Sequence, residues 1–168
     1  MELIISNLKV APVKKYMKID ESTFIDTNLL VFTCDYGSPW FKQAVALRED
    51  ILKGNINACI SPQVLYEFYA VITNPKRVLN PISVSLALKE VRNYIMAKQF
   101  KKIYPSSETT LNKVFELVET TKLDKTDIFD AHIIAVMLES GIYHILTDNE
   151  KDFMRFKGIK VTNPFKVK

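Results

Sequence analysis

The sequence predicts an α/β fold in which a mainly parallel β-sheet carries helices on both faces. Short runs of β-branched and aromatic residues alternate along the chain with longer runs of helical periodicity. The 168 residues suit one domain with a sizeable core, and no internal repeat or low-complexity tract divides them. Such alternation is typical of parallel sheets, because parallel neighbours need long crossover connections that are usually helical.

The strands are expected where short apolar runs lie between turn residues. They are predicted at residues 22–26, 56–60, 102–104, 142–147 and 159–162. The run at 102–104 carries the weakest pattern, and Pro105 ends it. In a sheet of this kind the ligand site lies beyond the carboxyl ends of the strands.

The helices are expected where apolar residues recur at intervals of three and four. They are predicted at residues 39–53, from 61 onward, and at 83–100, 107–121 and 126–140. Gly54 can close the first of these helices in a left-handed conformation. Ser61 and Pro62 can open the second as N-cap and first helical residue. Two Asn-Pro pairs, at 74–75 and 80–81, interrupt the chain after it.

Composition narrows the class of protein. The apolar fraction of 48% and charged fraction of 25% exclude a disordered chain, and no apolar run approaches the roughly 20 residues that span a bilayer. We expect residues 1–16 to be a leader or extension of unknown role and residues 17–168 to form the domain.

Cys34 and Cys59 lack metal-ligand spacing and are expected to pack as apolar residues in a reducing cytosol, so we expect a cytoplasmic protein. The net charge of +4 is compatible with a polyanionic partner.

Four acidic residues stand where a site is expected. Asp26 and Asp148 end predicted strands, whereas Glu67 and Asp130 interrupt apolar helical runs. Isolated carboxylates among apolar side chains are costly, and several together repel one another. Mg²⁺ or Mn²⁺ would remove that cost, because hard cations prefer carboxylate oxygens. A metal held in this way could activate water toward a phosphodiester.

Each acid also has a structural interpretation. Asp26 could cap a helix that starts at Thr27, Glu67 could pair with a lysine, and Asp148 could be a turn residue. Of Asp127 and Asp130, one could be only a cap, and we favour Asp127 for that role. The residues by themselves do not name the reaction.

Three segments and one acid resemble the motifs of PIN domains. The segments are Phe24-Ile25-Asp26-Thr27-Asn28-Leu29-Leu30, the run from Thr126 to Ala135 around Asp130, and Leu146-Thr147-Asp148-Asn149-Glu150-Lys151-Asp152-Phe153. Glu67 matches the second acid, which PIN domains carry on a helix. The resemblance covers residues 17 to 168. It implies a Rossmann-like three-layer α/β/α sandwich and Mg²⁺- or Mn²⁺-dependent hydrolysis of RNA.

The resemblance is strongest to VapC-like toxins, which are commonly dimers silenced by an antitoxin. It therefore implies an RNA substrate, an antitoxin partner and a homodimer, which we expect to form through apolar helix faces such as that of residues 83–100.

The implied catalytic residues are Asp26, Glu67, Asp130 and Asp148, and the implied metal ligands are Asp26, Asp130 and Asp148. The implied supporting shell is Thr27, Asn28, Asp127, Thr147 and Asn149. Relatives often carry Asp or Asn at the position of Asn149, so either Asp148 or Asn149 could fill the fourth position. Asp152 is expected to start the next turn.

Other residues are assigned structural roles or minor ones. The aromatic residues Phe68, Tyr69, Phe115 and Phe129 are expected in the core, and His132 and His144 outside the catalytic set. Lys151 and Arg155 could contact RNA phosphates. Two other functions stay open: an RNA-processing nuclease without an antitoxin, and a degenerate domain that binds RNA or protein without cleaving.

Overall fold

The sheet of this protein contains five strands, and every neighbouring pair is parallel. The computed structural model describes residues 19–124 and 127–166, so the prediction for residues 1–16 lies outside the described residues. The strands are β1 (Ile19–Ile25), β2 (Ile56–Ile60), β3 (Phe100–Lys102), β4 (His144–Leu146) and β5 (Lys160–Thr162). Their spatial order is β3-β2-β1-β4-β5. The predicted parallel sheet is thereby confirmed.

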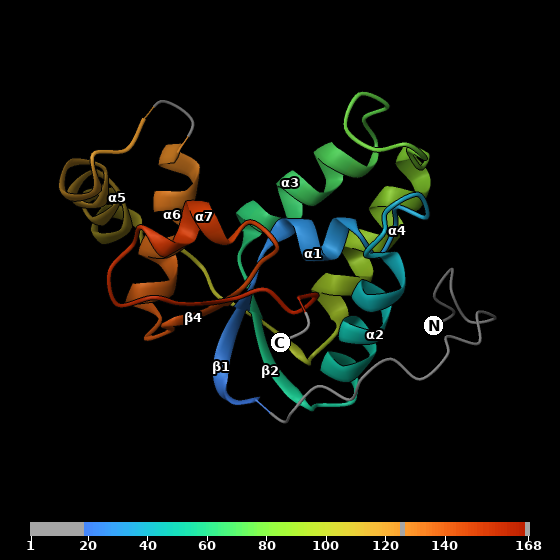
Figure 1. Ribbon diagram of the computed structural model, residues 1–168, viewed down its shortest axis with the longest axis horizontal. Helices are drawn as coiled ribbons and strands as arrows, with labels where there is room; N and C mark the ends of the chain where they lie inside the picture. The colour runs from blue at the N-terminus through green and yellow to red at the C-terminus, as the bar shows by residue number, and fades with distance from the viewer. Residues whose placement is uncertain (1–18, 125–126, 167–168) are drawn as a thin grey trace.

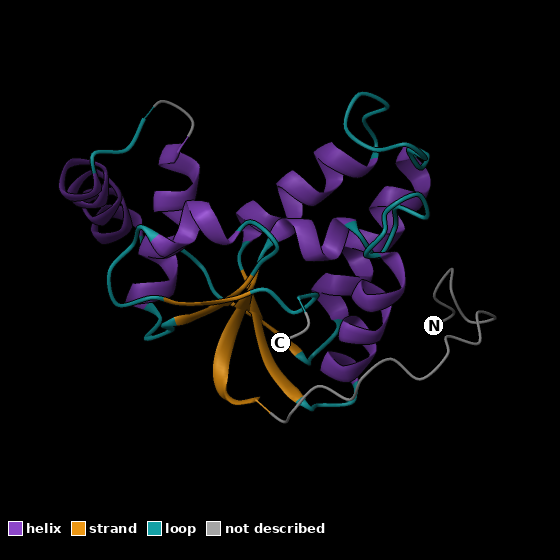
Figure 2. Ribbon diagram, viewed as in Figure 1, coloured by secondary structure: helices purple, strands orange, loops and turns teal. Residues whose placement is uncertain are grey.

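Helices cover both faces of the sheet, which gives the predicted three-layer α/β/α sandwich (Figures 1 and 2). One side carries α1 (Thr27–Val31), α2 (Phe41–Leu52), α3 (Pro62–Ile72) and α4 (Val84–Met96). The other side carries α5 (Ser107–Thr121), α6 (Ile128–Glu139) and α7 (Glu150–Met154). No helix in the described ranges is long and apolar enough to cross a membrane.

The strand order reverses direction at β1, and this reversal positions the site. The chain moves outward from β1 through β2 to β3, then returns to the other side of β1 to form β4 and β5. Helices on either side of such a reversal diverge, so the carboxyl ends of β1 and β4 border a crevice. Asp26 follows β1 directly, and Thr147 and Asp148 follow β4 directly.

The core lies on both faces of the two central strands. Phe24 and Ile25 of β1 and Ile145 of β4 are completely buried. On one side they are covered by residues such as Phe68 of α3, and on the other by the apolar residues of α6, including Ile134. Burial of this kind stabilises by about 25 cal/mol per Å² of apolar surface, which is ample to anchor two adjacent strand ends.

The structure corrects the boundary between the helix predicted at 83–100 and the strand predicted at 102–104. Helix α4 ends at Met96, because Ala97 adopts extended backbone angles, and β3 begins already at Phe100. Phe100 is buried with its ring edge-on to Tyr94, at a centroid distance of 5.1 Å. The apolar spacing through Phe100 therefore reflects packing of a strand residue, not continuation of the helix.

Two other details of the secondary structure concern the site. Gly54 has a φ of +79°, which confirms the left-handed conformation expected after α2. Helix α7 was not predicted, since its five residues are too few to show a periodic pattern. It places Asn149, Asp152 and Arg155 three residues apart along one short helical segment.

Candidate active site

Asp26 is the buried acid at the carboxyl end of β1. Its backbone N–H donates to the Leu146 carbonyl, at 3.0 Å, which continues the β1–β4 pairing. Its side chain is enclosed: Oδ1 accepts from the Thr27 backbone N–H at 2.7 Å, and Oδ2 accepts from the Thr147 hydroxyl at 2.6 Å. Asp26 thus caps α1, as the structural interpretation held, while it also faces the crevice.

Burial raises the pKa of Asp26 to about 7, and the charges of Asp148 and Glu67 add to the rise. The two hydrogen bonds to Asp26 lower its pKa but do not offset the burial. A carboxyl group poised in this way is half protonated near neutral pH in the absence of a cation. A pKa perturbation of this size is typical of functional sites, where carboxyl groups are buried and crowded together.

Glu67 reaches the same site from α3. Its Oε2 accepts a hydrogen bond of 2.8 Å from the Thr27 hydroxyl, so Thr27 joins Glu67 to the residue that follows Asp26. Glu67 is exposed, and its hydrogen bond is to this threonine and not to a lysine. Its charge contributes to the raised pKa of Asp26, which places it in electrostatic range.

Asp148 lies beside Asp26, and Asn149 points elsewhere. Burial raises the pKa of Asp148, and a hydrogen bond with the Asn28 side chain acts in the opposite direction. Oδ1 of Asp148 is buried and accepts no hydrogen bond within the described part of the chain. The backbone N–H of Asn149 donates to the Thr147 hydroxyl, whereas its side-chain amide donates to Asp152.

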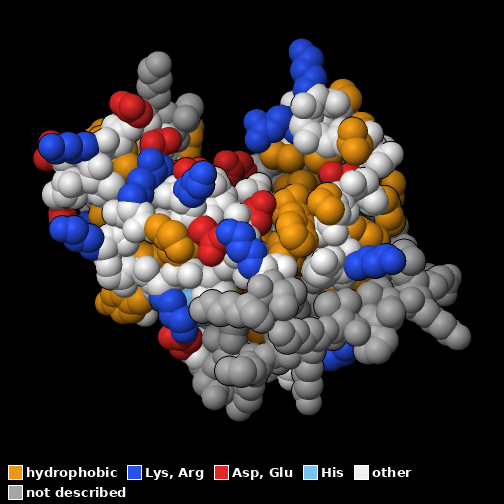
Figure 3. Space-filling view, in the orientation of Figure 1, with side chains coloured by type: hydrophobic (Ala, Val, Ile, Leu, Met, Phe, Trp, Pro, Cys, Tyr) orange, Lys and Arg blue, Asp and Glu red, His pale blue; other side chains and the backbone are white. Residues whose placement is uncertain are grey.

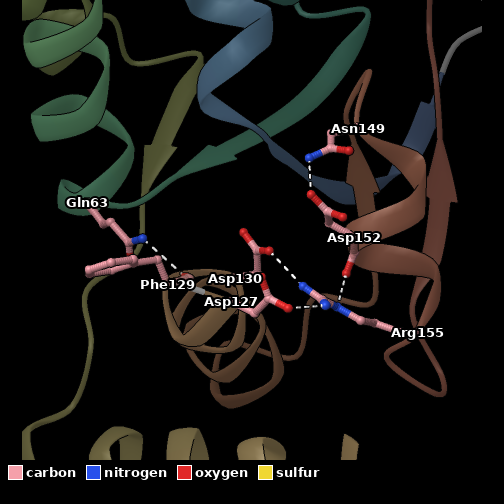
Figure 4. A network of polar contacts seen from close by, with 7 residues as sticks. All are labelled: Gln63, Asp127, Phe129, Asp130, Asn149, Asp152 and Arg155. Atoms are coloured by element: carbon pink, nitrogen blue, oxygen red, sulfur yellow. Dashed lines mark hydrogen bonds and ion pairs between the residues drawn. The ribbon is translucent and has the colours of Figure 1, made fainter. Parts of the chain in front are cut away.

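Asp130 belongs to a second group, on α6 and α7. Figure 4 shows the carboxylates of Asp127 and Asp130 directed toward Arg155, which bonds them at 2.5 and 3.0 Å. Burial raises the pKa of Asp130 to about 6, and the charges of Asp152 and Asp127 add to the rise against the opposing effect of Arg155. Asp127 takes the N-cap position of α6 but makes no capping hydrogen bond with its side chain.

The predicted acids thus fall into two groups. The sheet-edge group is Asp26, Thr27, Glu67, Thr147 and Asp148, and the helix group is Asp127, Asp130, Asp152 and Arg155. The hydrogen bond from Asn149 to Asp152 connects the loop after Asp148 to the helix group. Within residues 19–124 and 127–166, no three acidic, histidine or cysteine side chains form a compact metal-binding cluster.

Sequence reasoning missed Asp152 and the role of Arg155. Asp152 was assigned to a turn, but it lies on α7 and its charge acts on Asp130. Arg155 was expected to contact RNA, whereas its guanidinium is engaged by two carboxylates of this chain. The available signal was the spacing of Asn149, Asp152 and Arg155, which brings residues three apart to the same side of a helix.

An apolar groove adjoins the site. It has a volume of about 760 Å³ and lies between the start of α3 and the helices α5 and α6. Among its lining residues are Tyr66 and Phe129, which directly precede Glu67 and Asp130. Gln63, another lining residue, donates to the Phe129 carbonyl at 3.2 Å and so links α3 to α6. The placement of Phe115 and Phe129 in the core was wrong: they are 52% and 57% exposed, because they face this groove.

The two histidines differ in their surroundings. His132 lines the groove, burial lowers its pKa, and its Nδ1 has no hydrogen-bond partner among the described residues. His144 is buried in β4, where its ring nitrogens contact the hydroxyls of Thr23 and Thr162. These contacts are those of a packed histidine.

Comparison with known proteins matches the chain to one family model and to a curated relative. The family model described as PIN domain matches residues 23–159. Ribonuclease VapC24 of Mycobacterium tuberculosis is 23% identical over 140 residues, which cover 83% of this chain and 94% of the relative.

Two solved structures share the fold. VapBC2 from Rickettsia felis, bound to a DNA fragment from its promoter, superposes with a TM-score of 0.61 at 18% identity, covering 84% of this chain and 98% of that one. The sarcin-ricin loop cleaving toxin VapC20 of Mycobacterium tuberculosis gives 0.56 at 16% identity, covering 73% and 86%. At these identities the structural similarity establishes the fold alone.

Proposed function

The chain belongs to the PIN domain family, and on that basis we propose that it is an endoribonuclease that hydrolyses RNA phosphodiester bonds with Mg²⁺ or Mn²⁺. We propose further that it is the toxin of a toxin–antitoxin pair. The relative named as a ribonuclease, which aligns with 83% of the chain, supports the proposed RNA hydrolysis. The observation that carries the proposal is Asp26: a buried carboxyl group with a pKa of about 7 at the reversal point of a parallel sheet.

The residues present fit a hard divalent cation. Asp148 carries a buried oxygen that accepts no hydrogen bond among the described residues, and the charges of Asp148 and Glu67 raise the pKa of Asp26. A cation would coordinate the buried oxygen of Asp148, and it would offset the repulsion between the carboxylates that raises the pKa of Asp26. We therefore propose Asp26 and Asp148 as its ligands, and we add Asp130 of the helix group because it matches an acid of the PIN-domain motifs. When bound, such a cation supplies Lewis-acid activation of water and stabilises the leaving oxygen.

The chain's own residues supply orientation and proton transfer. Thr147 and the Thr27 backbone N–H fix both oxygens of Asp26, so this carboxylate does not reorient during the reaction. Thr27 holds Oε2 of Glu67, which leaves Oε1 to take the proton of an attacking water. The water oxygen then bonds to phosphorus, the bond from phosphorus to the leaving sugar oxygen breaks, and solvent returns a proton to that oxygen.

The surface is compatible with a polyanionic substrate. Figure 3 shows the molecule hollowed between the α3 side and the α6–α7 side, with acidic side chains at the bottom of the hollow and Lys and Arg on both sides of it. Cations on the rim can hold phosphates while the acids retain the metal. With Arg155 engaged internally, we keep Lys151, which is exposed on α7, as the proposed phosphate contact.

Two apolar surfaces are available to protein partners. The groove exposes aromatic side chains, which are enriched in protein interfaces, and we propose it, in place of the face of residues 83–100 expected from the sequence, as the surface of a homodimer. Helix α4 exposes a second face that includes Val84, Leu88 and Ile95, and we propose this face for the antitoxin.

The test is RNA cleavage by the purified protein with Mn²⁺, with Mg²⁺ and with EDTA. Cleavage that appears with either metal and disappears with EDTA is expected. Metal-dependent cleavage without growth arrest on expression would favour an RNA-processing enzyme that has no antitoxin. RNA binding without any cleavage would favour the degenerate domain.

A further inference from the structure

Arg155 is held at several points within the helix group (Figure 4). One terminal nitrogen bonds Asp127 at 2.5 Å, and the other bonds Oδ2 of Asp130 at 3.0 Å. Nε donates to the Asp152 carbonyl at 2.7 Å, and the guanidinium carbon lies 5.6 Å from the centre of the Phe156 ring. The arginine therefore connects α7 to the start of α6.

Most of the contacts of Arg155 do not involve Asp130. The bonds to Asp127 and to the Asp152 carbonyl, together with the Phe156 ring, hold the guanidinium in place by themselves. Giving up the bond to Asp130 would cost one contact of the arginine and would leave the others intact. Arg155 thus has three contacts, at the start of α6 and in or just after α7, that do not involve Asp130.

The charge of Arg155 opposes the proposed ligand role of Asp130. The guanidinium neutralises part of the negative charge of Asp127, Asp130 and Asp152. A divalent cation on Asp130 would meet this positive neighbour at close range, because Arg155 stays anchored beside it. Over about 5 Å, even with the screening of water, such repulsion weakens binding by about tenfold.

We propose that Arg155 is a positioning residue for Asp130 that competes with the cation for its Oδ2. In the metal-free protein the guanidinium holds this carboxylate in place and keeps the helix group assembled. On metal binding it yields Oδ2 and remains on Asp127. The inference rests on the proposed function, since it takes Asp130 as a metal ligand.

The decisive measurement is Mn²⁺ affinity by calorimetry, without RNA. Arg155→Gln is expected to bind Mn²⁺ about tenfold more tightly than the wild type, because the competing charge is removed. Lys157→Gln is the matched control: it removes the same charge from an exposed position two residues later and is expected to change affinity less than about twofold. Arg155→Lys keeps the charge but cannot bridge two carboxylates, so a smaller gain of about two- to threefold is expected.

Thermal stability separates competition from a purely structural role. In EDTA, Arg155→Gln should melt at a lower temperature than the wild type, because Asp127 and Asp130 lose their counter-charge. Saturating Mn²⁺ should narrow that gap, since the variant binds the ion more tightly. A gap of equal size with and without Mn²⁺ would show that Arg155 is only structural.

The outcomes distinguish this inference from the proposed function. Mn²⁺ binding by the wild type, with equal or weaker binding by Arg155→Gln, overturns the role of Arg155 alone. Absence of Mn²⁺ binding in the wild type and in every variant overturns the proposed metal dependence and this inference with it. If Arg155→Gln does not fold, Arg155→Lys decides: no gain in affinity over the wild type would contradict competition.

Discussion

The hydroxyl of Thr147 donates a 2.6 Å hydrogen bond to Oδ2 of Asp26, and so ties the carboxyl end of β4 to that of β1. The residues are 121 positions apart in the chain. The backbone bond from Asp26 to Leu146 lies beside it. Thr147 is completely buried, and its hydroxyl also accepts a hydrogen bond from the Asn149 backbone N–H at 2.9 Å, so it joins the Asp26 carboxylate to the loop after β4. The reversal of strand order between β1 and β4 therefore determines the orientation of the central acid.

Replacing Thr147 with valine should alter the pH dependence of RNA cleavage. The variant keeps the shape of the side chain but leaves Oδ2 of Asp26 without its donor, which raises the pKa of Asp26 further. With Mn²⁺ below saturation we expect cleavage at pH 7 to fall about tenfold and to recover in part about one to two pH units higher, because the proton on Asp26 competes with the cation. Thr110→Val is the control, because Thr110 is also buried and donates to a carboxylate, that of Glu139. An unshifted pH profile for Thr147→Val would contradict the proposed role.

Replacing Asp26 with asparagine should abolish metal-dependent cleavage while the fold is retained. Asparagine can still cap α1, but its neutral amide is a weak ligand for a hard cation. We expect a loss of at least about 100-fold in cleavage rate, and a melting temperature that no longer rises with Mn²⁺. Without metal, the variant should be at least as stable as the wild type, because it buries no charge. Cleavage at the wild-type rate would leave Asp26 as a helix cap only.

The metal-free protein should become less stable as pH rises from about 4 to about 7 through the ionisation of Asp26. Its pKa is about 7 in the folded protein against an ordinary value of 3.8, so the folded state binds more protons in this range and its free energy of unfolding decreases with pH. Asp130, with a pKa of about 6, acts in the same direction. His132 and His144 act oppositely, because burial lowers their pKa.

The difference between wild type and Asp26→Asn in denaturant unfolding therefore isolates the effect of Asp26. Relative to the variant, the wild type should lose stability steadily across this pH range, and Mn²⁺ at pH 7 should restore it. Parallel stability curves for the two proteins would show that Asp26 ionises normally.

Replacing Phe115 with lysine should convert the proposed homodimer into a monomer. The side chain is half exposed on the wall of the groove, where an ammonium group would be desolvated in an interface. Light scattering at micromolar concentration is the measurement. Leu88→Lys on the exposed face of α4 is the control and should remain dimeric. If instead Leu88→Lys dissociates the dimer and Phe115→Lys does not, the two surfaces have exchanged roles; a wild-type monomer would remove the dimer altogether.

The sequence by itself determined which segments form a parallel sheet, and it placed two of the acids at the ends of its strands. Period-two and period-three-to-four apolar patterns are local, so they predicted strands such as Ile56–Ile60 and helices such as Ser107–Thr121 with the observed bounds. Asp26 and Asp148 follow buried strands, and the carboxyl ends of parallel strands share one edge. That placement needs no tertiary information beyond the direction of the strands.

Only the tertiary structure decided which charges meet and which aromatic side chains are exposed. Arg155 bonds Asp127 and Asp130 across 28 and 25 positions of chain, and Asp152 faces Asp130 only because α7 packs beside α6. Likewise, Phe115 and Phe129 have the spacing of core residues, yet α5 and α6 pack so that both rings face the groove. Periodicity specifies a face of a helix, whereas the partner of that face depends on contacts between distant segments. Such contacts leave no local pattern in the sequence.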